Sequence, residues 1–149
     1  MMKKIWIFIG LVSLLVSACS PLPGSELARN QDKWRAAAID HYRFDLSVLC
    51  FCPFSAQMPL SVEVMDGKVV SMTYNDGTPV PESERANFSA YATIDALFAY
   101  TEDAVRQADE IQIAYDPAYG FPSRVQIDFV KNAVDDELAL GAENFQALP

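Results

Sequence analysis

The sequence predicts an α+β fold in which two helices pack on one face of a mostly antiparallel sheet of five to six strands. Two segments carry apolar residues at helical spacing, several shorter segments alternate apolar with polar residues, and turn residues separate them. Clean alternation is typical of antiparallel strands with one covered face and one face in water. The expected order is helix, three strands, helix, and two or three strands, with both helices on one side of the sheet.

The first predicted helix spans about residues 26–41 and the second begins after Thr93. Ser25 and Thr93 are candidate N-caps, because their hydroxyl groups can accept a hydrogen bond from a free N–H of the first turn. Both segments repeat apolar residues near helical spacing. In the first these are Leu27, Trp34, Ala38 and Tyr42, and in the second Ile94, Leu97, Phe98, Ala104, Val105 and Ala108.

Five segments alternate strongly enough to predict strands. They are residues 42–50, 60–64, 70–74, 111–115 and 125–129. Pro53 ends the first strand or places it at a sheet edge, because proline cannot donate to a strand ladder. After the acidic run 135–137 the tail is apolar but weakly patterned as far as Leu148. The number of strands therefore stays at five or six.

Asp66-Gly67 predicts a hairpin between the second and third strands. A two-residue loop would set Val62 opposite Ser71. A three-residue loop over residues 65–67 would set Val62 opposite Val70 and Leu60 opposite Met72. We expect the second register, because Gly67 then takes the left-handed bulge position.

The charge of the chain excludes some classes of partner. The 149 residues, a one-domain length, have a net charge of −9, and loss of Lys3 and Lys4 with a signal peptide would make it −11. Nucleic-acid binding needs basic patches, so it is not expected. A surplus of acids also disfavours anionic lipid. It permits cationic partners such as metal ions or basic proteins.

The N-terminus has the features of a bacterial lipoprotein precursor. Lys3 and Lys4 precede an apolar stretch over residues 5–16, which is shorter than the roughly 18 to 20 residues of a membrane span. Val16-Ser17-Ala18-Cys19 resembles the lipobox, which implies cleavage before Cys19 and acylation of that cysteine. Acyl chains would hold the protein on the lipid bilayer. An ordinary secretory signal with a chance cysteine is the alternative.

This interpretation divides the chain into a signal peptide (1–18), a lipidated tether (19–24) and a single α+β domain (25–149). Ser20 stands where an aspartate usually retains a lipoprotein at the inner membrane. That resemblance places the protein in the bacterial cell envelope, at the outer membrane and facing the periplasm.

If lipid occupies Cys19, two cysteines remain, Cys50 and Cys52. An even count in an oxidising compartment predicts a disulfide. In a straight strand their α-carbons would be near the upper limit of disulfide reach, and a bend before Pro53 would shorten the gap. Thiol–disulfide exchange, free thiols and a metal site are the alternatives. A soft-metal site is disfavoured, because His41 is the only histidine available as a further ligand.

The connection over residues 116–122 is a candidate binding loop, with Asp116, Tyr119 and Phe121 as its side chains. The alternative is that both rings fold back onto the sheet edge. Asp116, Asp128 and Asp135 also offer the oxygen ligands that calcium prefers, and we expect Asp116 and Asp128 to lie near each other because they flank one connection.

Six motifs resemble those of an uncharacterised family of small bacterial lipoproteins, known as a domain of unknown function. They are Trp34-Arg35, Tyr42-Arg43-Phe44, Cys50-Phe51-Cys52-Pro53, 66–70, 115–122 and 132–137. The resemblance covers about residues 30–140 and implies no assigned activity.

The sequence lacks the common hydrolase motifs, phosphate-binding glycine loops and dinucleotide fingerprints, so catalysis is not favoured and no cofactor is expected. The leading hypothesis is a non-catalytic lipoprotein that binds an envelope protein or cell-wall partner through an open sheet face or the 116–122 loop. The alternatives are a thiol–disulfide active envelope protein using Cys50 and Cys52, and a calcium-binding module.

Overall fold

The computed structural model describes residues 23–149, in three α-helices, two short 3-10 helices and six strands. Residues 1–22, which hold the predicted signal peptide and Cys19, lie outside the described part. The elements are α1 (Pro23–Ala37), β1 (His41–Leu49), η1 (Ser55–Gln57), β2 (Leu60–Met65), β3 (Lys68–Thr73), α2 (Glu82–Arg85), η2 (Ala86–Phe88), α3 (Ile94–Gln107), β4 (Glu110–Tyr115), β5 (Pro122–Asp128) and β6 (Glu137–Ala147).

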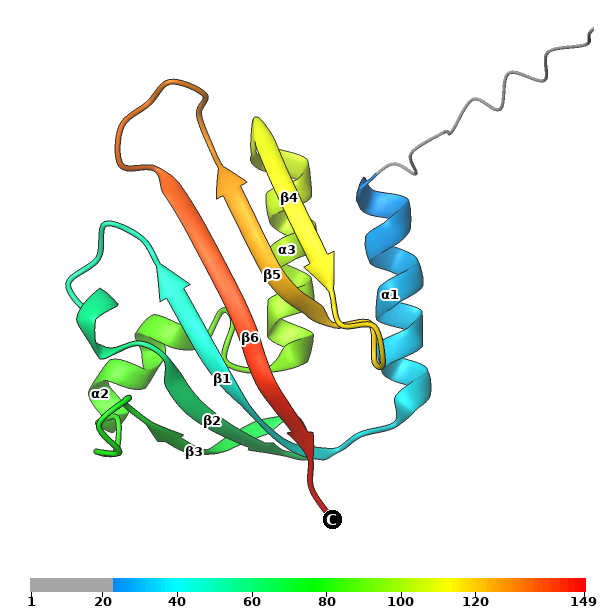
Figure 1. Ribbon diagram of the computed structural model, residues 1–149, viewed down its shortest axis with the longest axis vertical. Helices are drawn as coiled ribbons and strands as arrows, with labels where there is room; N and C mark the ends of the chain where they lie inside the picture. Colours follow the sequence, from blue (N-terminus) through cyan, green and yellow to red (C-terminus); the bar gives the residue numbers. More distant parts are fainter. Residues whose placement is uncertain (1–22) are drawn as a thin grey trace, which may run out of the picture.

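The six strands form one antiparallel sheet in the order β3-β2-β1-β6-β5-β4 (Figure 1). This confirms the predicted α+β fold. The weakly patterned tail is the sixth strand, and it lies between β1 and β5 in the middle of the sheet. It joins the first three strands to the β4–β5 hairpin, so the sheet is continuous only because the last strand inserts there.

One face of the sheet packs against the helices. Every second side chain of β1, from Tyr42 to Val48, is buried on this face. The two long helices, α1 and α3, run antiparallel, since the Trp34 indole near the end of α1 donates a hydrogen bond of 3.2 Å to Asp95 in the first turn of α3. The Trp34 ring meets Tyr42, Phe121 and Phe145 edge-on. This aromatic group fixes α1 on the sheet.

The first helix differs from its prediction at both ends. It includes Pro23 and Gly24, which were expected in the tether, and it ends at Ala37 rather than at residue 41. Ala38 has φ +49°, so the backbone leaves the helix there and His41 already begins β1. Proline is tolerated in a first turn because its missing N–H would have no helical partner.

The second helix confirms its predicted N-cap. The Thr93 hydroxyl accepts a hydrogen bond of 3.0 Å from the Ala96 N–H, and α3 covers residues 94–107. The loop expected after Pro79 contains the short helices α2 and η2, which place Phe88 in the core.

The register expected for the first hairpin is wrong. The loop has two residues, Asp66 and Gly67, both with positive φ, and Met65 lies opposite Lys68. A bulge then adds one residue on β3, so Val62 faces Met72 rather than Val70 or Ser71. A two-residue turn followed by a regular register would point Met72 toward water. The bulge shifts the register by one residue, so the turn stays tight and Met72 is buried.

The central strand β6 also contains a bulge. Leu140 and Ala142 point into the core, and Asn144 has φ +52°. The register with β1 shifts at this point, which returns Phe145 to the core side of the sheet. The Asn144 amide donates a hydrogen bond of 2.7 Å to Asp45 on the neighbouring strand.

None of the helices in residues 23–149 has the length and apolar character needed to cross a membrane.

Candidate functional site

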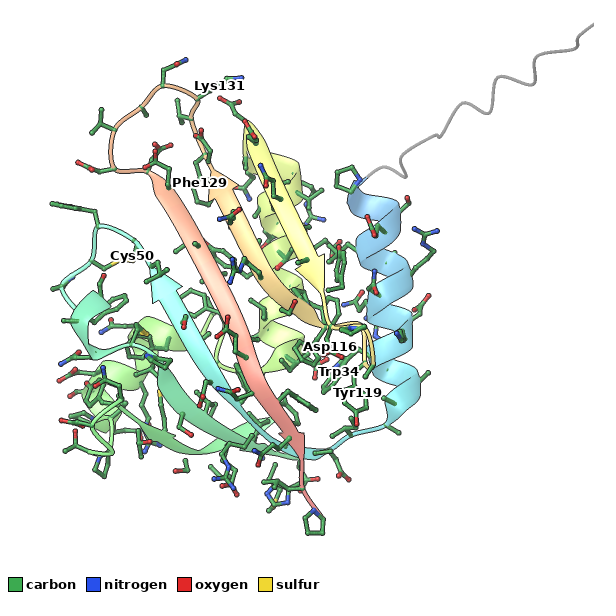
Figure 2. All side chains as sticks on the ribbon, in the orientation of Figure 1. Trp34, Cys50, Asp116, Tyr119, Phe129 and Lys131 are labelled. Atoms are coloured by element: carbon green, nitrogen blue, oxygen red, sulfur yellow. A yellow bond between two sulfur atoms is a disulfide. The ribbon has the colours of Figure 1, made fainter. Side chains whose placement is uncertain are left out.

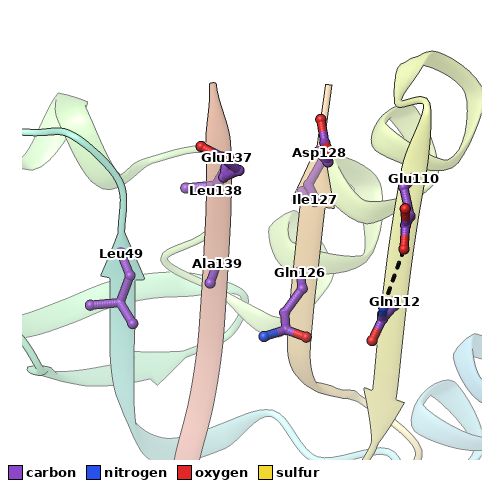
Figure 3. A pocket seen from close by; sticks show the side chains of 9 residues that line it. All are labelled: Leu49, Glu110, Gln112, Gln126, Ile127, Asp128, Glu137, Leu138 and Ala139. Atoms are coloured by element: carbon purple, nitrogen blue, oxygen red, sulfur yellow. Dashed lines mark hydrogen bonds between the residues drawn. The ribbon is translucent and has the colours of Figure 1, made fainter. Parts of the chain in front are cut away.

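The face of the sheet opposite the helices carries a shallow hollow over β6 and β5 (Figure 3). We call it the sheet groove. It has a volume of about 330 Å³, and its side chains come from four strands: Leu49, Glu110, Gln112, Gln126, Ile127, Asp128, Glu137, Leu138 and Ala139.

The groove exists because β6 presents small residues to the open face. Ala139 and Gly141 lie between the longer side chains of β1 and β5, and Ala139 is the direct partner of Leu49 and of Gln126. A Cβ added at Gly141 would meet the Cβ of Ser47 at 3.4 Å, an ordinary contact. The floor of the groove is therefore formed by the Ala139 methyl group and the strand-paired backbone of β6, which continues to Gly141, and the amides of Gln126 and Gln112 form its wall on β5 and β4.

Acidic groups gather at one end of the groove. Burial raises the pKa of the Asp128 carboxyl above its usual value, and the charges of Asp136 and Glu137 raise it further. Within the described residues, Asp128 Oδ1 and Asp136 Oδ1 are buried acceptors without a hydrogen-bond donor. The Gln112 amide donates a hydrogen bond of 3.4 Å to Glu110 at the same end (Figure 3). This end therefore offers acceptor oxygens and negative potential.

Cys50 and Cys52 lie at bonding distance, with their α-carbons 5.2 Å apart. The two α-carbons are this close because the chain makes a tight turn at Phe51, in which the Cys52 N–H donates a hydrogen bond to the Cys50 carbonyl at 2.8 Å. The Ser55 hydroxyl bridges the carbonyls of both cysteines, at 3.0 and 2.9 Å. The turn follows the last residue of β1 and lies beyond the upper end of that strand (Figure 2).

The 116–122 connection lies against α1 (Figure 2). The Asp116 carboxylate accepts hydrogen bonds from the N–H groups of Ala118 and Tyr119, at 2.9 and 2.6 Å, and so closes the turn. Lys33 on α1 donates to the Pro117 carbonyl at 2.6 Å.

Both aromatic rings of this connection pack inward. Phe121 is buried against Trp34 and Phe145, and Tyr119 is half-buried against Phe145. This is the arrangement in which the rings fold back onto the sheet, and it leaves Phe121 inaccessible to a ligand.

The three acids considered for calcium do not come together. Asp116 follows β4, whereas Asp128 ends β5 and lies at the opposite end of the sheet. The seven residues of β5 separate them by roughly 20 Å at 3.3 Å per residue, so the expectation that they lie near each other is wrong. Among residues 23–149, no group of three or more His, Cys, Asp or Glu side chains could hold a metal ion.

His41 begins β1, where sequence reasoning had placed a helix end. Its Nε2 lies 3.0 Å from Glu63 Oε1, and its Nδ1 lies 2.9 Å from the Pro149 carbonyl oxygen. Both partners are acceptors, so the ring can satisfy them together only as the doubly protonated imidazolium. The hydrogen bond to Glu63, followed by that to Pro149, raises the pKa of His41 above 6.5.

Sequence reasoning identified an open sheet face but missed the residues that line it. The signal that could have found them is the pair of small residues at alternate positions 139 and 141 in the tail, which predicts a hollow only once that tail is known to be a central strand.

Comparison with known proteins gives one family. No curated protein and no solved structure matches the chain. The model of a family of unknown function, DUF6174, matches residues 26–147, which is nearly the whole described part and far more than half of the chain. The chain therefore belongs to this family of unknown function, DUF6174.

Proposed function

We propose that this chain is an exported, lipid-anchored and non-catalytic binding module of the bacterial cell envelope, which holds a basic segment of a partner protein in the sheet groove. The groove with its acidic end is the observation that carries the binding part of the proposal. The lipobox-like Val16-Ser17-Ala18-Cys19 carries the anchoring part.

The chemistry of the groove suits an extended or loop-borne peptide. Its apolar floor at Ala139 and Gly141 can accept backbone or small side chains, and Gln112 and Gln126 can donate and accept hydrogen bonds along one side. A Lys or Arg at the acidic end would donate hydrogen bonds to the exposed carboxylates of Glu110 and Glu137, which line the groove there.

Site-specific photocrosslinking in intact envelopes tests this proposal. A photoreactive amino acid at Gln126 in the groove should crosslink a partner, whereas the same amino acid at Ser71 should not. Ser71 is exposed on β3, at the sheet edge away from the groove, and is therefore a matched position.

A charge variant tests the basic character of the partner. Glu110→Gln with Glu137→Gln should lower the crosslinking yield at Gln126 several-fold, because a basic partner segment loses two of the carboxylates that attract it to the groove. Glu102→Gln with Asp103→Asn removes the same charge from the exposed side of α3 and should leave the yield unchanged. Equal yields from Gln126 and Ser71 would contradict a site in the groove.

The bonded cysteine pair supports a second candidate, a thiol–disulfide active envelope protein. A bridge that closes so short a loop gains little from loop closure, and weakly stabilised bridges are the reducible ones. Alkylation of freshly exported protein distinguishes the two: a fixed bridge leaves both cysteines unlabelled, whereas a redox couple gives a mixture that shifts with added reductant.

A further inference from the structure

Four large apolar side chains are exposed at one end of the sheet: Leu49, Phe51, Val130 and Val134, with 56, 86, 57 and 83% of their surface accessible. We call them the apolar tip. Leu49 ends β1, and Phe51 follows in the cysteine turn. Val130 and Val134 lie in the connection between β5 and β6.

Strand pairing brings the two loops of the apolar tip to the same end of the sheet. Leu49 pairs with Ala139 near the start of β6, and Asp128 at the end of β5 pairs with Glu137, so the 129–136 connection emerges beside the end of β1. In Figure 2 Cys50 follows the upper end of β1, and Lys131 lies higher, in the connection above β5 and β6.

The N-terminal end of α1 lies toward the same end of the molecule. Gly24 and Leu27 share a hollow with Val105 and Arg106, in the last turn of α3. Glu110 opens β4 three residues after α3 and pairs with Asp128. Figure 1 accordingly shows α1 and β4 both starting toward the end that carries the 129–136 connection.

Cys19 precedes Pro23 by four residues, which can span at most about 14 Å between α-carbons. We infer that the apolar tip contacts the interfacial layer of the same bilayer that holds Cys19, and that this contact orients the domain. The inference rests on the proposed lipid anchor. A short tether at the end of the molecule that exposes Phe51 and Val134 brings these side chains to the bilayer surface.

The cysteine pair and local hydrogen bonds hold the two loops that carry these side chains. The cysteine pair and the Ser55 hydroxyl constrain the turn around Phe51. The other loop is fixed by Asp136, which accepts a hydrogen bond of 2.6 Å from the Val130 N–H, and by Asp109, which accepts one of 2.9 Å from the Lys131 N–H.

The charge around the apolar tip selects the kind of lipid. Carboxylates surround it at Asp109, Asp128, Asp135, Asp136 and Glu137, with Lys131 as the cation in the same connection. Anionic headgroups would be repelled, whereas zwitterionic headgroups offer ammonium groups to these acids. The bilayer surface that fits is therefore rich in neutral lipid.

This contact would orient the domain so that the end of the sheet with the apolar tip faces the membrane. The groove runs beside β6 on the open face, so it would open sideways next to the membrane, with its acidic end at Asp128 and Glu137 nearest the bilayer surface.

Depth-dependent quenching of tryptophan fluorescence tests the inference on the full, processed chain reconstituted in phosphatidylcholine vesicles with brominated acyl chains. After processing, Trp34 is the only native tryptophan and is buried, so the wild type supplies the background. Phe51→Trp and Val134→Trp should each lose a large part of the added emission, because rings at the acyl–headgroup boundary lie within reach of the bromine atoms.

Met65→Trp is the matched control, because Met65 is also an exposed apolar residue, 41% accessible, but lies opposite His41 at the other end of the sheet. Its added tryptophan should not be quenched. Replacing half of the lipid by phosphatidylglycerol should weaken the quenching at Phe51→Trp, and unchanged quenching would refute the selection of neutral lipid.

Mass spectrometry of the same samples separates the possible failures. If Cys19 carries lipid and Phe51→Trp is quenched no more than Met65→Trp, the membrane contact is refuted while the anchor stands. The tryptophan of Phe51→Trp could be shielded from quenching by acrylamide without being quenched by the brominated lipid. The apolar tip would then contact a second copy of the chain, and the membrane contact would be refuted. If Cys19 carries no lipid, the proposed anchor and this inference both fail.

Discussion

Gly120→Ala tests the close docking of the 116–122 connection on α1. Gly120 has φ +82°, and a Cβ there would lie 2.8 Å from the Asn30 carbonyl oxygen and 3.1 Å from the Lys33 side chain. The left-handed conformation alone costs an alanine about 1–2 kcal/mol. The clash with helix backbone cannot be relieved by rotating a side chain, and overpacking of this kind costs about 1–3 kcal/mol more. We expect a total loss of about 2–5 kcal/mol.

Gly77→Ala is the matched control for this prediction. Gly77 has φ +83° and nothing within 4 Å of its Cβ position, so it should lose only the backbone contribution of about 1–2 kcal/mol. Urea unfolding followed by Trp34 fluorescence measures both variants. The wild-type ring lies in the aromatic group beneath the connection and reports on its docking. Equal destabilisation of the two variants would refute a rigid docked connection and restore the loop as a mobile binding element.

Two further predictions concern stability. The double variant Cys50→Ala with Cys52→Ala should fold, and its free energy of unfolding should fall by only about 1–2 kcal/mol, because closing so short a loop removes little entropy from the unfolded chain. Calorimetry measures this loss, and a value above about 4 kcal/mol would contradict a local role for the bridge. The pKa of His41 is raised above 6.5, so its contribution to stability is full below that pH and is lost as the pH rises through the higher folded-state pKa. NMR titration of this single histidine should show the raised pKa, and Glu63→Gln should lower it; an unchanged pKa in the variant would refute the pairing.

The elements predicted well are those whose period is uninterrupted. β1 alternates without a break from Tyr42 to Val48, and α3 combines a hydroxyl cap at Thr93 with one apolar face, so local physics determines both. The third strand was misaligned because two apolar residues, Val69 and Val70, stand side by side. Alternation alone does not say which of them the bulge turns outward.

The central strand was the hardest to predict because its pattern is broken by its own structure. Small residues weaken the alternation at Ala139 and Gly141, and the bulge at Asn144 shifts it by one before Phe145. The position of this strand between β1 and β5 is a long-range pairing that no local pattern encodes. The groove could not be assembled from the sequence for the same reason, since its residues meet only through that pairing.

The apolar tip illustrates the same limit. Phe51 and Val134 are far apart in the sequence and belong to loops, where an exposed apolar residue carries no periodic signal. The separation of Asp116 from Asp128 likewise follows from the direction of β5, which carries the chain from one end of the sheet to the other.

Mass spectrometry of the mature N-terminus from bacterial envelopes is the most direct test of the proposed function. We expect a chain that begins at Cys19 and carries the mass of a diacylglyceryl group together with an acyl chain. An unmodified chain that begins at Ser20 or later would contradict it, because no anchor would then hold the groove and the apolar tip beside a membrane.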